Sequence, residues 1–302
     1  MKSFVNKCLI GLLAVAAVAG IERLSHALTD GFSCANITSS LPYNPKWDIT
    51  FEPEDLLELE TALDQPFSYL ESGSQSYVFI SEDNNYVLKF FKHKRWRMNP
   101  LYEKLPLPKK FAEKRDRWKR KKKKTVASTF GSCKIAYTIF KNETGVIFVH
   151  LNKNTPFDHT VILKDRMGLK HHIQLEDVEF VVQKKAIPTA EYLLSLKKEG
   201  RTQEAQEALK ELLAFTEMRA KKGFSDKDPH LIRNFGFING KAVELDIGGF
   251  HRDPKKNLEY FYNHELKKIH YKLLPWLQEN YPELVPVAHE ELQSSKASVK
   301  IN

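Results

Sequence analysis

The chain has 302 residues, of which 42% are hydrophobic and 28% are charged, and its net charge is +9. This composition is ordinary for a globular protein and excludes a disordered or fibrous chain. Its three cysteines are too few for a disulfide scaffold and too widely spaced for a metal cluster, although Cys34 and Cys133 could pair in an oxidising compartment.

The first residues have the pattern of an export signal or a membrane anchor. Basic Lys2 and Lys7 accompany an apolar run over residues 8–21. This run is shorter than the roughly 20 residues that span a bilayer, but it suits the core of a signal peptide. Small residues at 17–19 and 25–27 offer cleavage positions. We therefore expect residues 1–27 to be a signal peptide or anchor and the protein to be exported or membrane-associated, with a buried terminal helix as the alternative.

The next part of the chain predicts one helix and three strands. Residues 28–66 form an N-terminal extension that contains a helical pattern over 52–63. Strands are expected at 67–70, 76–80 and 86–91, because Gly73 and the polar run 82–85 supply turns between apolar segments.

A dense basic segment follows these strands. From Lys109 to Lys124 the chain has eleven lysines and arginines against two acids, a local charge of +9, so the rest of the chain is formally neutral. We expect a helix over 107–141, either continuous or in two pieces that meet near Gly131. The simplest interpretation is a solvated helix face or a mobile loop, and the alternative is a surface for acidic lipid. Trp96 and Trp118 lie among the basic residues, but nucleic acid is the less favoured partner.

The remainder changes from strands to helices. Strands are expected at 146–151, 160–163, 171–175 and 179–183, and the paired histidines His171 and His172 should point to opposite faces in structural roles. Helices are expected at 189–198, 202–222 and 257–280, and a disordered tail at 290–302. Asn239-Gly240 between apolar runs predicts a β-hairpin. The fold class expected is therefore α+β.

Two motifs in this order resemble the ATP site of the protein-kinase-like superfamily. Residues 73–79 lead into Tyr86-Val-Leu-Lys89, which is similar to a glycine loop followed by Val-Ala-Ile-Lys. Asn234 leads through the predicted hairpin to Asp246-Ile-Gly248, which is similar to Asp-Phe-Gly. The resemblance implies a two-lobed fold with an antiparallel-sheet N-lobe at 67–186. A reduced, mainly helical C-lobe would follow at 187–289, as in atypical or small-molecule kinases. The resemblance is compatible with a bacterial member of this group.

The resemblance also implies the parts of an ATP–Mg²⁺ site. Asn234 and Asp246 would bind the metal, and Asp228 would orient the acceptor hydroxyl. Six further positions would hold the nucleotide through its phosphates or its adenine, namely Gly73, Ser74, Ser76, Lys89, Gln183 and Ala186.

Several positions depart from the family pattern. The loop has one glycine where three are usual, and Asp228 lies six residues before Asn234 where five are usual, so Asp226 competes for its role. In the family a glutamate on the following helix pairs with the strand lysine; here that partner of Lys89 is either Glu113 or absent. Residues 250–253 resemble a remnant of the activation segment. The function implied is a Mg²⁺-dependent phosphotransferase acting on a hydroxyl acceptor. The alternatives are an inactive pseudokinase scaffold and a membrane-associated binding protein that uses the basic segment.

Overall fold

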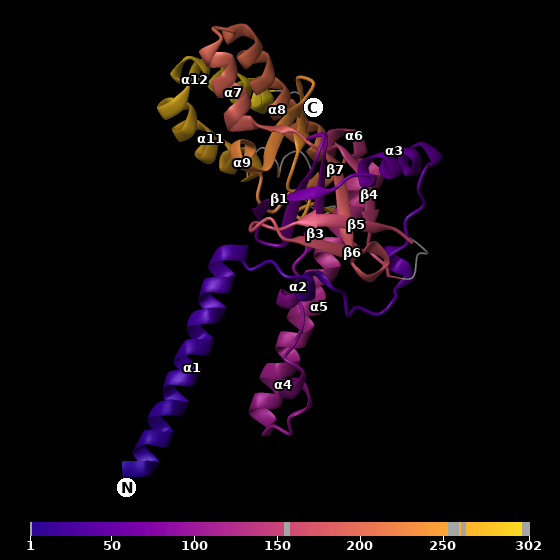
Figure 1. Ribbon diagram of the computed structural model, residues 1–302. Coiled ribbons are helices and arrows are strands. Elements are labelled where there is room, and N and C mark those ends of the chain that lie inside the picture. Colours follow the sequence, from indigo (N-terminus) through magenta and orange to yellow (C-terminus); the bar gives the residue numbers. More distant parts are fainter. Residues whose placement is uncertain (1, 154–157, 253–259, 261–263, 298–302) are drawn as a thin grey trace.

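The computed structural model describes residues 2–153, 158–252, 260 and 264–297, and these form two lobes (Figure 1). The first lobe contains a seven-stranded sheet with the order β4-β7-β3-β2-β1-β5-β6. All neighbouring strands in it are antiparallel except β1 and β5, which are parallel. The strands are β1 (Phe67–Ser72), β2 (Ser76–Ser81), β3 (Tyr86–Phe91), β4 (Val146–His150), β5 (Thr160–Lys164), β6 (Lys170–Gln174) and β7 (Phe180–Lys184).

The helices of this lobe pack through apolar side chains against the sheet. Leu59 and Leu63 of α3 (Pro53–Leu63) join one core with Phe79 and Phe148, whereas Leu56 and Leu57 of the same helix are exposed. Phe130 of α5 (Lys109–Ile139) belongs to a second core. Shorter helical segments connect these elements: α2 (Cys34–Ile37), η1 (Pro45–Trp47), η2 (His93–Arg95), α4 (Pro100–Lys104), α6 (Lys141–Thr144) and η3 (Leu175–Asp177).

Helix α5 decides between the two expected alternatives, because it continues through Gly131 without a break. A Cβ placed at Gly131 would have no atom within 4 Å, so this glycine serves no close approach. The neighbouring Phe130 and Cys133 are buried and hold the helix against the sheet. Tertiary packing thus outweighs the low helix propensity of a single glycine.

The second lobe is mainly helical and has its own core of leucines and aromatic residues. Its strands pair at the boundary between the lobes, where β8 joins β10 and β12 joins β9. The elements are β8 (Ile187–Pro188), α7 (Thr189–Lys198), α8 (Thr202–Lys221), β9 (Phe224–Ser225), α9 (Leu231–Asn234), β10 (Phe235–Ile238), β11 (Lys241–Glu244), β12 (His251–Arg252), α11 (Leu266–Asn280), η5 (Pro282–Leu284) and α12 (Val285–Ala297).

The end of the chain is more helical than expected. Helix α12 extends to Ala297, so the first part of the expected disordered tail is helical, and 298–302 lie outside the described residues. The helix expected over 257–280 is found as α11 from Leu266, while 257–259 and 261–263 lie outside the described residues.

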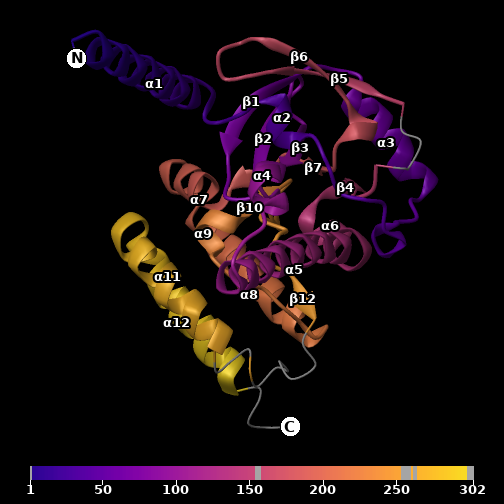
Figure 2. The same ribbon diagram turned by 90° about the horizontal axis from the view of Figure 1, so that it is seen from below.

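Helix α1 (Lys2–Thr29) projects from the first lobe, and Figure 2 shows it apart from the sheet. Its C-terminal end is fixed to that lobe, because the Tyr77 hydroxyl donates to the Gly31 carbonyl and the Tyr69 hydroxyl donates to Asp30 at 2.5 Å. Phe32 is buried in the core that follows. Among the described residues, no helix combines the length and apolarity that crossing a bilayer needs.

Candidate active site

Lys89 lies in the middle of β3, where strand pairing fixes its position. It is opposite Val78 on β2 and Val181 on β7. Its ammonium group donates a hydrogen bond of 2.8 Å to the carbonyl of Leu245, at the end of the second motif. Burial lowers the pKa of Lys89, and the negative charge of Asp246 opposes that change. The two motifs, distant in sequence, therefore meet at this lysine.

The predicted hairpin brings Asn234 and Asp246 together. Strands β10 and β11 are joined by Asn239 and Gly240, which have φ of 50° and 78°, as a tight hairpin of this sequence requires. At its open end the amide of Leu245 donates to the Asn234 carbonyl at 2.7 Å, and the amide of Asp246 approaches the same oxygen at 3.3 Å.

The side chains of Asn234 and Asp246 supply the kind of oxygen atoms that Mg²⁺ prefers. The Asn234 amide nitrogen donates to the Asp228 carbonyl at 2.8 Å, which leaves its oxygen to accept. One Asp246 oxygen accepts from the Gly248 amide at 3.1 Å. Within the described residues no cluster of three His, Cys, Asp or Glu side chains could hold a metal by itself. The donor set therefore fits a Mg²⁺ ion that also takes oxygen ligands from a phosphate or water.

A cavity of about 570 Å³ opens at this point between the two lobes. Asp228, Asn234 and Asp246 line its floor from the second lobe, and Ser74 and Gln75 line it from the β1–β2 loop. Helix α5 and the neighbouring loop add three lysines, Lys121, Lys124 and Lys227. The cavity thus combines metal-type oxygen donors with a cationic rim, which suits a phosphorylated ligand.

Asp228 and Asp226 have different environments, although both line the cavity. The exposed Asp228 pairs with Lys272 of α11, and this hydrogen bond lowers the pKa of its carboxyl group. Asp226 is buried, and an added Cβ on Gly249 would lie only 1.7 Å from its Oδ1 atom. Asp228 is therefore the more exposed of the two carboxylates that line the cavity, and Asp226 is packed against the Gly249 segment.

Asp226 also belongs to a cluster that is centred on a fully buried arginine. Arg219 of α8 lies 2.6 Å from Glu244 of β11 and 3.6 Å from Glu265. Asp226 adds a third negative group near the same guanidinium. Burial raises the pKa of Glu244 well above its usual value, and the adjacent Asp226 raises it further. The cluster joins α8, the Asp246 hairpin and the loop that bears Asp228.

The β1–β2 loop is held close to Asp246 by polar contacts. Its backbone accepts hydrogen bonds from Lys92 at Gly73 and from Arg95 at Ser74. Gly73 itself has no left-handed φ, and a Cβ there would meet only ordinary contacts at 3.6 Å or more. The fold does not require glycine at this position, so the absence of further glycines does not distort the loop. Ser76 lies at the start of β2, where its carbonyl accepts from the Gly73 amide at 2.9 Å.

Gln75 is a site residue that the sequence did not reveal. Its Oε1 atom accepts a hydrogen bond of 2.7 Å from the Thr129 hydroxyl of α5. Its Nε2 atom would lie 3.2 Å from a Cβ added to Gly248, as would Asp246 Oδ1. The side chain therefore links the loop, α5 and the Asp246 segment. A polar residue between two serines in this loop could have indicated a contact with the ligand. The direction of the Gln75 side chain, however, depends on how α5 packs against the loop.

The helix glutamate of the family pattern is missing from the described site. Lys89 forms no ion pair among the described residues, and Glu113 is exposed near the start of α5. Cys133 of α5 lies beside Lys89 and Asp246 instead, where burial raises the pKa of its thiol to about 12. Both described cysteines are free, so the pairing of Cys34 with Cys133 is not found.

The remaining expected positions have structural contacts. Gln183 is buried in β7 and donates to the Thr144 carbonyl at 2.8 Å, so its side chain supports the sheet. Ala186 lies between β7 and β8, in the connection from one lobe to the other. His171 pairs with Asp165 at 2.8 Å. Residues 251–252 form β12, and Asp253 lies outside the described residues.

No protein family and no curated protein matches this chain. Among solved structures it is similar to the bifunctional kinase-methyltransferase WbdD, with 15% identity over 72% of this chain and 43% of WbdD and a TM-score of 0.34. It spans less than half of that protein. It is also similar to Rv3197 of Mycobacterium tuberculosis in complex with erythromycin (15% identity, 94% and 75% coverage, TM-score 0.28). A further similar structure is APH(2")-IIa in a ternary complex with streptomycin and ATP, with 14% identity over 81% of this chain and 89% of that chain and a TM-score of 0.25.

The fold is therefore assigned from the chain's own structure. A sheet lobe precedes a helical lobe, and Lys89 of β3 meets the Asn234–Asp246 hairpin between them. These features confirm the expected α+β, protein-kinase-like fold.

Proposed function

We propose that this protein binds ATP with Mg²⁺ and transfers a phosphoryl group to a hydroxyl acceptor. The observation that carries the proposal is the bond of 2.8 Å from Lys89 to the Leu245 carbonyl, next to Asp246. It places a buried cation against the backbone beside Asp246, and the two oxygen donors of the hairpin, Asn234 and Asp246, line the cavity. Phosphoryl transfer depends mainly on positioning and charge neutralisation, and these groups supply both.

Each residue has a role that follows from its contacts. Lys89 would hold the inner phosphates, while Ser74 and the backbone of the loop would cover the outer ones. Asn234 and Asp246 would hold Mg²⁺, which when bound neutralises phosphate charge. Asp228 would accept the hydrogen bond of the acceptor hydroxyl, since its pairing with Lys272 keeps it ionised. Ala186, between the lobes, would offer backbone groups to adenine.

The test is transfer of radiolabelled phosphate from ATP by the full chain in the presence of Mg²⁺. Asp246→Ala should lower the rate by about 100-fold or more, because it removes charge stabilisation that the reaction requires. Asp64→Ala, at the exposed end of α3, is the matched control and should retain activity. Equal rates for wild type and Asp246→Ala would refute the enzyme proposal.

A nucleotide-binding pseudokinase is the second candidate for this site. No helix glutamate pairs with Lys89 among the described residues, and the α5 residue beside it is Cys133; this observation favours the pseudokinase. It predicts that ATP raises the melting temperature of the wild type but not of Lys89→Met, without any transfer of phosphate. Transfer by the wild type would exclude it.

We further propose that the basic face of α5 associates with an acidic membrane surface. Three of its cations face inward, since Arg115 donates to the Leu105 carbonyl at 2.8 Å, Lys119 pairs with Glu103, and Lys122 contacts backbone carbonyls. The other eight form no ion pair among the described residues: Lys109, Lys110, Lys114, Arg117, Arg120, Lys121, Lys123 and Lys124.

Exposed apolar residues accompany these charges. Leu101 is 73% exposed, Phe111 is 55% exposed and Trp118 is 48% exposed, all beside the basic face. Helix α1, whose Ile10 and Val18 are each 66% exposed, projects from the same end of the molecule, away from the helical lobe (Figure 1). A surface that combines cations with exposed apolar groups suits an anionic bilayer better than a nucleic acid.

A further inference from the structure

A second cavity lies on another face of α5, separate from the candidate active site. Its volume is about 720 Å³, and it lies between α5 and the extension over residues 40–47. Lys121, Lys124 and Ser128 of α5 line the active-site cavity. The second cavity is instead lined by the α5 residues Lys119, Lys122, Lys123, Val126, Ala127 and Phe130.

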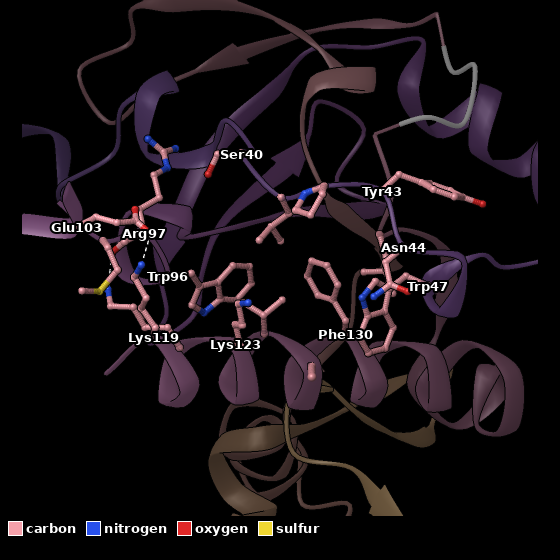
Figure 3. Close-up of a pocket in the computed structure, with 17 residues that line it drawn as sticks. Ser40, Tyr43, Asn44, Trp47, Trp96, Arg97, Glu103, Lys119, Lys123 and Phe130 are labelled. Carbon is pink, nitrogen blue, oxygen red and sulfur yellow. Dashed lines mark hydrogen bonds and ion pairs between the residues drawn. The ribbon is translucent and has the colours of Figure 1, made fainter. Parts of the chain in front are cut away.

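One part of this cavity is aromatic. Figure 3 shows Trp96, Phe130 and Trp47 in a row along α5. The Phe130 ring lies 5.6 Å from each of the two indoles, with interplanar angles of 87° to Trp47 and 81° to Trp96. Because these neighbouring rings meet edge to face, they do not form a parallel slot for a planar base. They offer an apolar wall that suits a flexible hydrocarbon chain.

The other end of the cavity is cationic. Arg97, Lys119, Lys122 and Lys123 line it against a single carboxylate, Glu103, which leaves a charge of +3. Glu103 is already paired with Lys119 at 2.7 Å, and Figure 3 shows both beside Arg97. The guanidinium of Arg97 donates through Nη2 to the carbonyls of Ala35 and Thr38, while its buried Nε atom has no hydrogen-bond partner among the described residues. The side chain of Lys123 likewise has no ion pair or hydrogen bond in the described part of the chain.

We propose that this cavity binds an anionic amphiphile, with its hydrocarbon chain along Trp47, Phe130 and Trp96 and its carboxylate or phosphate head at Lys123 and Arg97. An apolar wall of this kind gains free energy from burying a hydrocarbon chain, and the cationic end selects a negative head over a neutral one. The volume lies within the usual range for small-molecule sites.

Occupancy of the cavity would bear on the active site through α5. The opposite face of the same helix holds Gln75 through Thr129, and its Ser132 hydroxyl donates to the Ile247 carbonyl beside Asp246. A ligand that packs on Phe130 therefore contacts the helix that positions both segments. Binding itself does not require phosphotransfer, so it can be tested whether or not the protein is a kinase.

The experiment measures quenching of tryptophan fluorescence by the full chain with a medium-chain carboxylate that bears a terminal bromine, below its micelle concentration. We expect saturable quenching that the Trp47→Phe and Trp96→Phe variants reduce. Trp276→Phe, in the helical lobe, should leave it unchanged. The matched brominated alcohol should bind at least about tenfold more weakly, because it lacks the charge. A monoalkyl phosphate with the same chain should compete, and comparison with the carboxylate identifies the preferred head group.

Matched variants separate a specific site from general attraction to α5. Lys123→Gln should weaken carboxylate binding by roughly fivefold, as expected for one partly solvated charge contact. Lys110→Gln removes the same charge from an exposed position on α5 and should have no effect. Ala127→Trp should fill the cavity and abolish quenching, with the melting temperature as the check on folding. Equal binding of acid and alcohol, equal effects of the two lysine variants, or quenching by ATP in place of the amphiphile would each overturn the proposal.

Discussion

The buried cluster around Arg219 shows how single residues support the candidate site. Three acids, Asp226, Glu244 and Glu265, surround one guanidinium, and both Arg219 and Glu244 are fully buried. They cannot all be ionised without excess negative charge in a medium of low polarity. Burial and the neighbouring Asp226 raise the pKa of Glu244 against the opposing charge of Arg219, so folding favours the protonated form of this carboxyl group.

This cluster predicts a dependence of stability on pH. Because the pKa of Glu244 is higher in the folded than in the unfolded protein, its contribution is fully present below about pH 4.5 and decreases as the pH rises towards the folded pKa. Glutamine cannot release a proton, so wild type should lose stability relative to Glu244→Gln between pH 5 and 8, by up to about 1.4 kcal/mol per pH unit. Denaturant unfolding at several pH values measures the difference. Glu290→Gln is the exposed control, and a pH-independent difference would show Glu244 to be ionised.

Several residues of the site were predictable because local patterns fix them. The similarity of residues 86–89 to Val-Ala-Ile-Lys locates Lys89 on β3, and Asn239-Gly240 sets the hairpin that joins Asn234 to Asp246. Gln75 and Cys133 could not be assigned in this way. Their roles depend on how α5 packs against the sheet, which no local pattern of the sequence determines.

At the scale of elements, α5 forms one wall of each cavity. Its interior glycine also allows the cost of glycine in a helix to be measured. Gly131 lies in its interior, and an added Cβ would meet no atom within 4 Å. Gly131→Ala should therefore stabilise the protein by about 0.5–1 kcal/mol, through lower backbone entropy in the unfolded chain. Thermal unfolding should show a melting temperature higher by roughly 1–4 °C.

The matched change is Gly249→Ala, in the segment after Asp246. There the new Cβ would lie 1.7 Å from Asp226 Oδ1, so the variant should be destabilised and its active-site cavity distorted. A decrease in melting temperature for Gly131→Ala would show that this glycine has a role beyond the helix.

Of the two alternatives for residues 107–141, a continuous helix or two pieces that meet near Gly131, the structure shows the continuous helix. The basic and apolar periodicity of residues 109–139 specifies a helix, and one glycine lowers its stability by only about 1 kcal/mol. The contacts of Phe130, Cys133 and Tyr137 with the sheet lobe outweigh that cost.

At the scale of the whole molecule, α1 and the basic face of α5 project from one end, which predicts salt-sensitive binding to anionic vesicles. Replacement of Lys109, Lys110, Lys114 and Arg117 by Gln should reduce binding to phosphatidylserine vesicles by at least about tenfold, since each basic residue near such a surface contributes about 1 kcal/mol. Vesicle flotation at low and high salt measures this effect.

The control places the same loss of charge at the other end of the molecule, in α7, α8 and α11, with the substitutions K198Q, K210Q, K221Q and K267Q. This variant should bind as wild type does, and so should Asp246→Ala. Loss of vesicle binding in both multiple variants alike, or retention in both, would contradict the proposal. If the protein bound duplex nucleic acid tightly and did not bind vesicles, the partner of the basic face would be a nucleic acid and not a membrane.

The fixed base of α1 has a consequence for where the reaction would take place. Residues 30–32 are built into the sheet lobe, so a cut after Ala27 would leave Asp30, Gly31 and Phe32 in position and release an intact lobe. An uncut α1 of 28 residues is about 42 Å long at about 1.5 Å per residue. Held at a lipid surface, it would act as a short tether that keeps the cavity close to the lipid and raises its effective concentration towards acceptors there. Cleavage of one peptide bond would thus decide whether the same folded protein acts at a lipid surface or free in solution.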